Sequence, residues 1–233
     1  MQKPGVMPTP KSEKSEPPTR FAVALFPGFQ ALDVFGPLDI LNVLSRKTPL
    51  SLRVLAATLD PVSTRTDGTG HSTGQAVVPT HTFADDGDDD VEVLLVPGGF
   101  GTRDPENMRQ VVEYVRAAYP SLRFLLTVCT GSAVAAMSGV LDGRRATSNK
   151  VAWAWATAQG PKVRWAPRAR WVADGNIWTS SGISAGIDMM YAFVGDQFGE
   201  DVARELADAA EYVRNTDPGV DPFAAKAENG AAK

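Results

Sequence analysis

The sequence predicts an α/β fold in which helices cover both faces of a mostly parallel central sheet, and three observations support this prediction. A continuous apolar run at 21–26 and mainly apolar runs at 91–96 and 124–128 are typical of strands buried on both faces. Amphipathic stretches with a helical period lie between these runs. Proline and glycine follow the first two runs and end them. Strands that alternate with helices favour a parallel sheet, whose ligands bind beyond the carboxyl ends of the strands.

The remaining elements follow in order along one domain. Asp104 before Pro105 is typical of a helix start, and Pro120 ends that helix. Asp174-Gly175 predicts a hairpin turn between strands at 171–173 and 176–179. Further strands are expected at 51–57 and, as short antiparallel pieces, within 60–83. Further helices are expected at 33–44, from 129 to 138, at 185–198 and at 200–213.

Both ends of the chain are predicted to be flexible. Five of the 17 prolines lie in residues 1–20 among polar side chains, so this segment is expected to be a disordered arm. Residues 224–233 are small and polar without a periodic apolar face, and we expect a flexible tail there. One α/β domain then spans 21–223, and no DNA-binding unit is expected after it.

Composition and charge exclude several classes of function. The 23 basic and 27 acidic residues give a formal net charge of −4, which provides no basic surface for nucleic acid. No run approaches the roughly 18 apolar residues that a membrane-spanning helix needs, and no signal-peptide core follows the N-terminal lysines, so a cytoplasmic protein is predicted. One cysteine and two histidines leave no disulfide and no multi-cysteine zinc site.

Cys129 lies where a buried strand breaks into a helix, which is the placement of a nucleophile elbow. The partial positive charge and free N–H groups of a helix N-terminus lower the pKa of a thiol, so this placement predicts a reactive thiolate. The alternative is that Cys129 is a buried and inert apolar residue.

Two further segments after strands are candidates for the same site. Gly98 and Gly99 follow the strand at 91–96 and expose backbone N–H groups that suit an anion-stabilising nest, or form only a tight turn. Asp33 follows the first strand and is either a helix N-cap or a partner of Cys129. If it faces Cys129, burial and the thiolate raise its pKa and leave a protonated acid.

Other polar and aromatic residues are interpreted more simply. Five aspartates within 85–90 lack the spacing and the closing glutamate of a calcium loop, which favours a solvated acidic loop. His71 and His81 are assigned no role. Trp153 is either a core residue or the wall of an apolar pocket. The small residues of 182–186 favour close helix packing, within the chain or across a subunit interface.

Six segments occur together in a fixed order along the chain. They are Phe26-Pro27-Gly28, Leu32-Asp33-Val34-Phe35-Gly36-Pro37, Val96-Pro97-Gly98-Gly99, Val128-Cys129-Thr130-Gly131, and the segments 141–147 and 179–188. As an ordered set they resemble the ThiJ/PfpI superfamily, which has the class I glutamine amidotransferase-like fold. The resemblance covers residues 21–223 and implies a flavodoxin-like three-layer sandwich with a nucleophile elbow.

Within that superfamily the sequence is most similar to isonitrile hydratases and their relatives, which carry Asp after the first strand and Cys-Thr-Gly at the elbow. The resemblance implies addition of water to an isonitrile, R–N≡C, to give an N-substituted formamide, without a metal or organic cofactor. Cys129 would be the nucleophile, and Asp33 would donate a proton and later activate water. A homodimer acting on a small molecule is also implied.

The resemblance further implies the residues that would hold the reacting group. Thr130 would help to position it, and the Gly99 and Thr130 backbone N–H groups would form the anion-stabilising nest. Gly98 is predicted to belong to the same nest, and Asn149 and Trp153 are predicted to contact the substrate.

The sequence departs from the superfamily at one functional position. Many proteases, deglycases and glyoxalase-like members carry a histidine near the nucleophile, where this chain reads Ala146-Thr147-Ser148-Asn149. Because an asparagine cannot act as a general base, a Cys-dependent hydrolase or glyoxalase-like enzyme is the weakest of three hypotheses. The second is a redox or stress-response protein that senses oxidants through Cys129, oxidised to a sulfinate beside a protonated carboxyl.

Overall fold

The computed structural model describes residues 16–66, 73–84 and 91–230. In these residues a seven-stranded sheet has the order β10-β11-β7-β6-β1-β2-β5, and all neighbouring strands are parallel except the β10–β11 pair. Its strands are β1 (Arg20–Ala24), β2 (Ser51–Ala56), β5 (His81–Thr82), β6 (Val93–Val96), β7 (Phe124–Thr127), β10 (Trp171–Asp174) and β11 (Ile177–Ser180). The predicted mostly parallel sheet is therefore confirmed.

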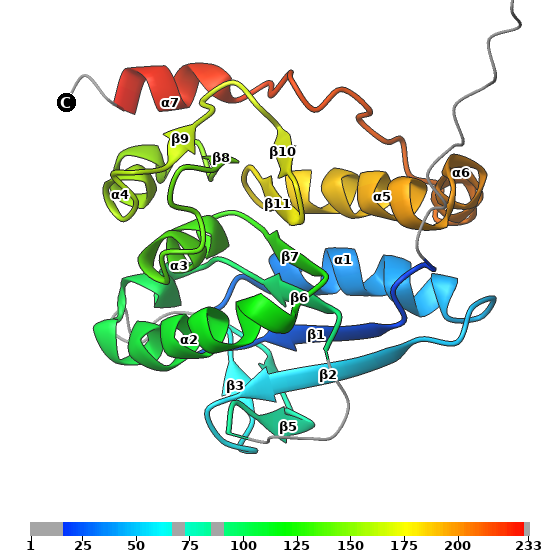
Figure 1. Ribbon diagram of the computed structural model, residues 1–233, viewed down its shortest axis with the longest axis horizontal. Coiled ribbons are helices and arrows are strands. Elements are labelled where there is room, and N and C mark those ends of the chain that lie inside the picture. The colour runs from blue at the N-terminus through cyan, green and yellow to red at the C-terminus, as the bar shows by residue number, and fades with distance from the viewer. Residues whose placement is uncertain (1–15, 67–72, 85–90, 231–233) are drawn as a thin grey trace, which may run out of the picture.

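Helices form two outer layers on this sheet (Figure 1). The first layer holds α1 (Ala31–Leu44), α5 (Ala185–Phe198) and α6 (Glu200–Ala209), which contact one another. The second holds α2 (Pro105–Ala118) and α3 (Gly131–Met137), which also contact each other. The predicted three-layer arrangement, with helices on both faces, is the fold that the structure has.

The central strands are buried because their side chains are apolar on both faces. All four residues of β6 are buried, and in β1 only Arg20 is exposed. Helix α2 begins as the sequence predicts: the Asp104 carboxylate accepts a hydrogen bond from the Glu106 backbone N–H, and Pro105 occupies the first turn. Burial of this apolar sheet supplies most of the driving force for folding.

Smaller elements surround the carboxyl edge of the sheet. Two short sheets pair β3 (Val62–Ser63) with β4 (Ala76–Val77) in antiparallel fashion and β8 (Arg145–Ala146) with β9 (Arg164–Trp165) in parallel. Short helices complete this edge, namely η1 (Phe100–Arg103), η2 (Tyr119–Ser121), α4 (Trp153–Ala158) and α7 (Ala224–Gly230). The antiparallel pair agrees with the short strands expected within 60–83.

Two predicted boundaries were wrong. The tail expected to be flexible from 224 onward forms α7, which contacts α4 (Figure 1) and buries Ala227. Asp221, followed by proline, starts this helix: its carboxylate accepts from the Phe223 backbone N–H. Helix α6 ends at Ala209 rather than at 213, because the chain enters the left-handed region at Glu211. Of the N-terminal arm, residues 1–15 lie outside the described residues.

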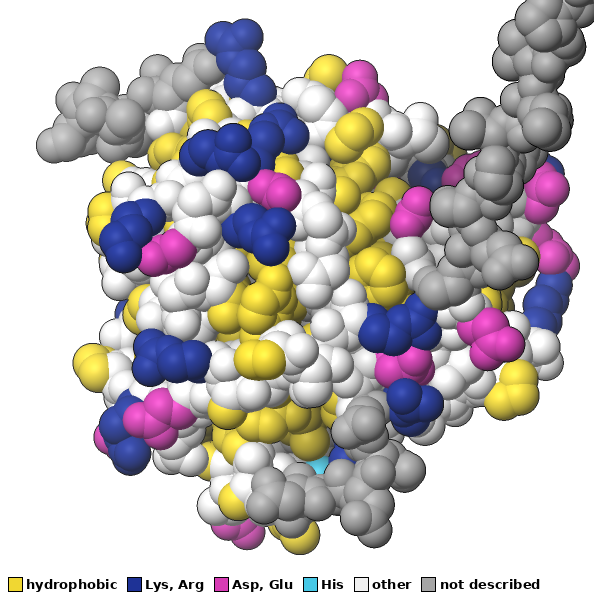
Figure 2. Space-filling view, viewed as in Figure 1, with side chains coloured by type: hydrophobic (Ala, Val, Ile, Leu, Met, Phe, Trp, Pro, Cys, Tyr) yellow, Lys and Arg dark blue, Asp and Glu magenta, His cyan; other side chains and the backbone are white. Residues whose placement is uncertain are grey.

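The described residues contain no helix that is long and apolar enough to cross a membrane. On the face drawn in Figure 2, Lys and Arg side chains lie beside Asp and Glu side chains, so charges of both signs are mixed. The ion pairs of the described residues include Lys162 with Asp142 at 2.9 Å. This mixing gives no large basic surface on the face in view.

Candidate active site

The carboxyl ends of β1, β6 and β7 bring three sequence segments together. The chain leaves β1 and enters α1, which carries Asp33; it leaves β6 at Gly98 and Gly99; and it leaves β7 at Cys129. The three strands are neighbours in the sheet, so the three loops lie side by side. This is the edge at which parallel α/β sheets bind ligands.

Cys129 occupies a strained turn between β7 and α3. Its φ is 59°, in the left-handed region that non-glycine residues rarely adopt, and such a conformation costs on the order of 1–3 kcal/mol. The Cys129 backbone N–H donates to the Ser181 carbonyl at 3.0 Å, which helps to hold the turn. A Cβ at Gly131 would lie 2.2 Å from the Val96 carbonyl oxygen, so only glycine fits after this elbow. The structure thus has the geometry of the nucleophile elbow.

Asp33 lies in the first turn of α1 with its side chain fully buried. Gln30 occupies the N-cap position, so Asp33 is not the cap. Its Oδ2 accepts a hydrogen bond from the Gly98 backbone N–H at 2.9 Å, and its Oδ1 has no hydrogen-bond partner among the described residues. Burial raises the pKa of Asp33 to about 7, against the lowering effect of the Gly98 N–H and of the Cys129 side chain.

The pKa of Cys129 shifts in the opposite direction to the one that its helix N-terminus predicts. Burial and the neighbouring Asp33 charge raise it to about 12, although hydrogen bonds from the Thr130 and Ile183 backbone N–H groups and from Asn149 oppose the rise. The expectation of a thiolate at rest was therefore wrong, because the removal of the sulfur from water outweighs the helix N-terminus. At neutral pH the proton lies on the thiol, next to a carboxyl whose own pKa is close to 7.

Asn149, in the segment between β8 and α4, contacts the thiol. Its Nδ2 donates to Cys129 Sγ at 3.2 Å, while its Oδ1 accepts from the backbone N–H groups of Val151 and Ala152 at 2.9 and 2.8 Å. These two acceptor bonds fix which end of the amide faces the sulfur. The structure therefore brings Asn149, Asp33 and Cys129 into one site.

The predicted anion nest differs from the arrangement found. The Gly99 N–H donates to Thr130 Oγ1 at 3.0 Å and the Gly98 N–H donates to Asp33, so neither is free to bind an anion. The Thr130 side chain is buried and also accepts from Thr102 Oγ1 at 3.2 Å. Of the predicted donors, only the Thr130 N–H points at the sulfur. The glycines serve instead to let the β6 loop approach the elbow: a Cβ at Gly98 would lie 2.5 Å from Thr130 N.

Trp153 does not line the pocket beside Cys129, so its predicted contact with the substrate is not supported by the geometry. It is buried on α4 with its ring edge-on to Trp165, at a centroid distance of 6.1 Å, and with Lys150 Nζ 4.9 Å from its ring centre. Apolar packing between α4 and β9 explains this position. The interpretation of Trp153 as a core residue is the one that the structure supports.

A cavity of about 330 Å³ opens above Cys129, which suits a small molecule. Its floor is formed by Cys129, Thr130 and Asn149, and η1 contributes Phe100 and Arg103 to its rim. The position of Arg103 was missed by sequence reasoning, because an isolated arginine in a short loop carries no motif.

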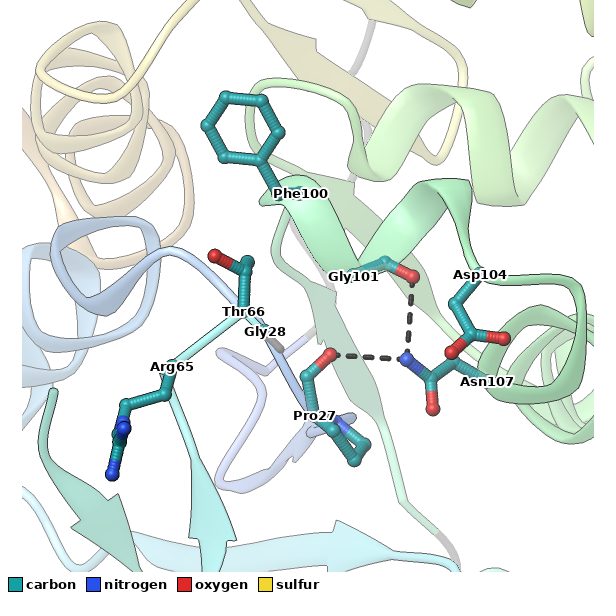
Figure 3. Close-up of a pocket in the computed structure, with 8 residues that line it drawn as sticks. All are labelled: Pro27, Gly28, Arg65, Thr66, Phe100, Gly101, Asp104 and Asn107. Atoms are coloured by element: carbon teal, nitrogen blue, oxygen red, sulfur yellow. Dashed lines mark hydrogen bonds between the residues drawn. The ribbon is translucent and has the colours of Figure 1, made fainter. Parts of the chain in front are cut away.

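A second and larger cavity of about 430 Å³ lies beside the first and shares Phe100 with it. In Figure 3 the Asn107 amide points at the Pro27 and Gly101 carbonyl oxygens, to which it donates at 3.1 and 3.4 Å. The Arg65 side chain points away from the other labelled residues. This neighbouring cavity holds no part of the Cys129 site apart from the ring of Phe100.

The segment 182–186 packs within the chain and against the site. A Cβ at Gly182 would lie 2.5 Å from Asn149 Nδ2, and one at Gly186 would lie 2.6 Å from Val128. Ile183, in the left-handed region with φ of 45°, directs its backbone N–H at Cys129 Sγ. The small residues were singled out correctly, but their contact with the site was missed.

His81 contributes nothing to the described site. His81 lies on the edge strand β5, with β2, β1 and β6 between it and β7, and its Nδ1 lies 2.8 Å from Thr80 Oγ1. His71 and the aspartates at 85–90 lie outside the described residues. Among the residues that the structure does describe, no group of three or more His, Cys, Asp or Glu side chains is arranged to hold a metal ion.

Fold and site together define an α/β protein with a buried cysteine at a nucleophile elbow and an aspartate beside it. The model of the DJ-1/PfpI family matches residues 19–196, and the chain belongs to this family. This confirms the predicted resemblance.

Two kinds of characterised relative are similar in sequence. Isonitrile hydratase of Pseudomonas putida is 33% identical over 188 residues, which cover 81% of this chain and 76% of the relative. The HTH-type transcriptional regulator GbdR of Pseudomonas aeruginosa is 31% identical over 124 residues, which cover 53% of this chain but only 33% of the regulator.

Solved structures agree with the fold. A ThiJ/PfpI family protein from Pseudomonas syringae has a TM-score of 0.69 at 25% identity, with 98% of this chain and 94% of that chain covered. Drosophila melanogaster DJ-1beta also has a TM-score of 0.69, at 19% identity, with 84% of this chain and 99% of that chain covered. The second likeness supports the fold alone.

Proposed function

We propose that this protein is a lyase that adds water to an isonitrile and releases an N-substituted formamide. The observation that carries the proposal is the pairing of Cys129 with a buried Asp33 whose pKa is raised to about 7. A carboxyl group with such a pKa exchanges a proton readily near neutral pH, in both directions. Similarity to an isonitrile hydratase over 81% of the chain supports the same substrate class.

In the first step the Cys129 sulfur adds to the terminal carbon of R–N≡C. Asp33 accepts the thiol proton as the sulfur–carbon bond forms and delivers it to the same carbon, which gives the thioimidate R–N=CH–S–Cys129. The sulfur carries negative charge during this transfer. The Thr130 and Ile183 N–H groups and the Asn149 amide, which already point at the sulfur, stabilise that charge.

In the second step Asp33 takes a proton from water as the hydroxyl adds to the thioimidate carbon, and gives it to the nitrogen. The tetrahedral adduct R–NH–CH(OH)–S–Cys129 then collapses to R–NH–CHO and the free thiol. The hydroxyl proton of the adduct passes to the sulfur in this collapse. The sum is R–N≡C plus H₂O giving R–NH–CHO, and the Cys129 thiol and the Asp33 carboxylate are restored. No step requires a metal ion or an organic cofactor.

The two alternative functions receive less support. Oxidants attack the thiolate, and the pKa of Cys129 is raised to about 12, which disfavours a resting role as an oxidant sensor. The hydrolase and glyoxalase-like alternatives were linked to a histidine near the nucleophile, and in the described part of the site the position after Ser148 holds the amide of Asn149. A homodimer in the cytoplasm is part of the proposal and stays a prediction.

The proposal is tested by incubating the purified protein with alkyl and aryl isonitriles and following formamide by mass spectrometry. Methylglyoxal and an activated ester, offered in parallel, probe the glyoxalase-like and hydrolase alternatives. Light scattering on the same sample gives the oligomeric state. Formamide formation above the rate in buffer supports the lyase, whereas no turnover across aliphatic and aromatic isonitriles would overturn it.

A further inference from the structure

The cavity beside Cys129 carries a cation at its rim. Of the described residues that line this cavity, Arg103 is the one with a charged side chain. Arg109, six residues further along the chain, is by contrast paired with Glu106. Within the described part of the chain, no carboxylate forms an ion pair with Arg103. A positive charge therefore faces the opening of a pocket that contains no compensating negative side chain on its walls.

Aromatic rings hold this guanidinium in place. Its central carbon lies 5.0 Å from the ring centre of Phe100 and 4.7 Å from that of Trp155. Such contacts use the faces of a guanidinium, whereas its N–H donors lie in its plane and stay available for hydrogen bonds. The side chain is thus pre-organised, although Arg103 itself is exposed.

The shape of the substrate connects this cation to the reaction. An isonitrile is linear, so a molecule with its terminal carbon at the buried Cys129 sulfur directs its R group out toward the rim. Phe100 is 68% exposed there, and Cys129 only 6%. The cavity of about 330 Å³ restricts R to a small group.

We propose that Arg103 binds a carboxylate on the R group, so that the substrates of this site are small isonitriles that carry a carboxylate. This specificity rests on the proposed hydration of isonitriles. A guanidinium matches the two oxygens of a carboxylate with two parallel N–H donors, which a lysine ammonium does not. The ion pair would hold the R group in place and would take no part in the bonds that form and break at Cys129.

The first experiment compares isocyanoacetate with its neutral methyl ester as substrates, by their kcat/KM for formamide. The wild-type protein is expected to prefer the carboxylate by about two- to fivefold, the range that a partly exposed ion pair provides. Arg103→Met should abolish the preference and Arg103→Lys should keep part of it. Arg65→Met is the matched control, because it removes the same charge from the neighbouring cavity and should leave the preference intact.

A second experiment measures anion binding by Arg103 without using an isonitrile. Cys129 is the single cysteine of the chain, so its alkylation by iodoacetate and by iodoacetamide can be followed by intact mass. The rate constant for iodoacetate divided by that for iodoacetamide should fall about two- to fivefold in Arg103→Met and stay unchanged in Arg65→Met.

The two experiments separate the two proposals. A ratio that does not change in Arg103→Met overturns anion binding by Arg103, whatever the isonitrile assay gives. A ratio that falls, together with no turnover of any isonitrile, supports anion binding by Arg103 and contradicts the hydratase proposal alone.

Discussion

The Asn149 amide donates a hydrogen bond to Cys129 Sγ at 3.2 Å. Its oxygen is held by the Val151 and Ala152 N–H groups, so the amide cannot turn its acceptor toward the sulfur without losing two hydrogen bonds. Asn149 therefore stabilises negative charge on the sulfur but removes no proton from it. In the proposed mechanism, proton transfer is therefore assigned to Asp33.

Replacing Asn149 by Asp separates the donation of a hydrogen bond to the sulfur from the acceptance of two backbone hydrogen bonds. Asn149→Asp keeps an oxygen for the Val151 and Ala152 N–H groups but places a second carboxylate beside the sulfur, which raises the pKa of Cys129 further. We expect the rate of Cys129 alkylation by iodoacetamide to fall at least about tenfold, with little change in melting temperature. Asn149→Ala is the comparison. Unlike Asn149→Asp, it should lose about 1 kcal/mol of stability, because both backbone N–H groups lose their acceptor. Equal alkylation rates in all three proteins would contradict this role.

Asp33 destabilises the folded protein above neutral pH. Burial raises its pKa from 3.8 to about 7, so the folded state binds more protons than the unfolded state between these values, and stability falls as pH rises through that window. Asn keeps an acceptor for the Gly98 N–H and does not ionise. Asp33→Asn is expected to be more stable than wild type above the raised pKa by roughly 1–4 kcal/mol, with the difference shrinking toward pH 4. Urea unfolding at several pH values measures it, and a difference independent of pH would refute it.

The rate of hydration should depend on pH through the Asp33 and Cys129 pair. The reactive form holds one proton between the two groups, and it forms as pH rises through about 7, where Asp33 loses its proton. We expect kcat/KM to rise with pH through this value and then to reach a plateau that extends well above it. The profile of wild type on a neutral isonitrile checks this. A decline of activity across pH 7 to 9 would assign the reactive form to a protonated Asp33 instead.

Gly98 is expected to tolerate no side chain. A Cβ there would lie 2.5 Å from Thr130 N and 3.0 Å from the Cys129 Cβ, so Gly98→Ala must displace the elbow. We expect loss of about 1–3 kcal/mol of stability and loss of most activity, measured by thermal unfolding and formamide formation. Gly139→Ala is the control, because open space surrounds that position and only its φ of 84° is strained; it should lose stability but keep activity.

A buried ion pair connects the segment before α7 to the loop that carries Asn149. Lys150 Nζ lies 3.8 Å from Asp221 Oδ2 and donates to Thr147 Oγ1 and to the Ala169 carbonyl. Burial lowers the pKa of Lys150 to about 8, and the Asp221 charge opposes this. Asp221→Asn removes that charge, so we expect a loss of roughly 3 kcal/mol at neutral pH.

The double variant Lys150→Met with Asp221→Asn provides the control for this pair. It leaves no uncompensated charge behind, so it should recover much of the stability lost in Asp221→Asn, as chemical denaturation would measure. Additive losses in the double variant would show that the two charges do not interact.

The layers of the fold were predictable because period and burial are local properties. Apolar runs such as 93–96 have no polar face, so they fit only a strand that is covered on both sides, and the structure confirms this. The tail at 224–230 was not predicted because its helix depends on a tertiary contact: Ala227 is buried, and α7 contacts α4. The proline after Asp221 was the local signal that marked its start.

The sequence predicted the central residues of the site but not their pKa values. Asp33, Cys129 and Gly98 follow three neighbouring strands, so topology alone brings them together. The pKa of Cys129 could not be predicted from its place in the sequence, because burial depends on everything packed around the sulfur. Arg103 was missed for a similar reason, since its position depends on a contact with Trp155 of α4, which is distant in sequence.

Formamide production from one neutral isonitrile, compared between wild type, Cys129→Ala and Asp33→Asn, examines the proposed chemistry itself. The Cys–Asp mechanism predicts no turnover above background in Cys129→Ala and a loss of at least about 100-fold in Asp33→Asn, since general acid–base catalysis contributes that much or more. Circular dichroism should show that both variants stay folded. Wild-type rates in folded Cys129→Ala would contradict the mechanism.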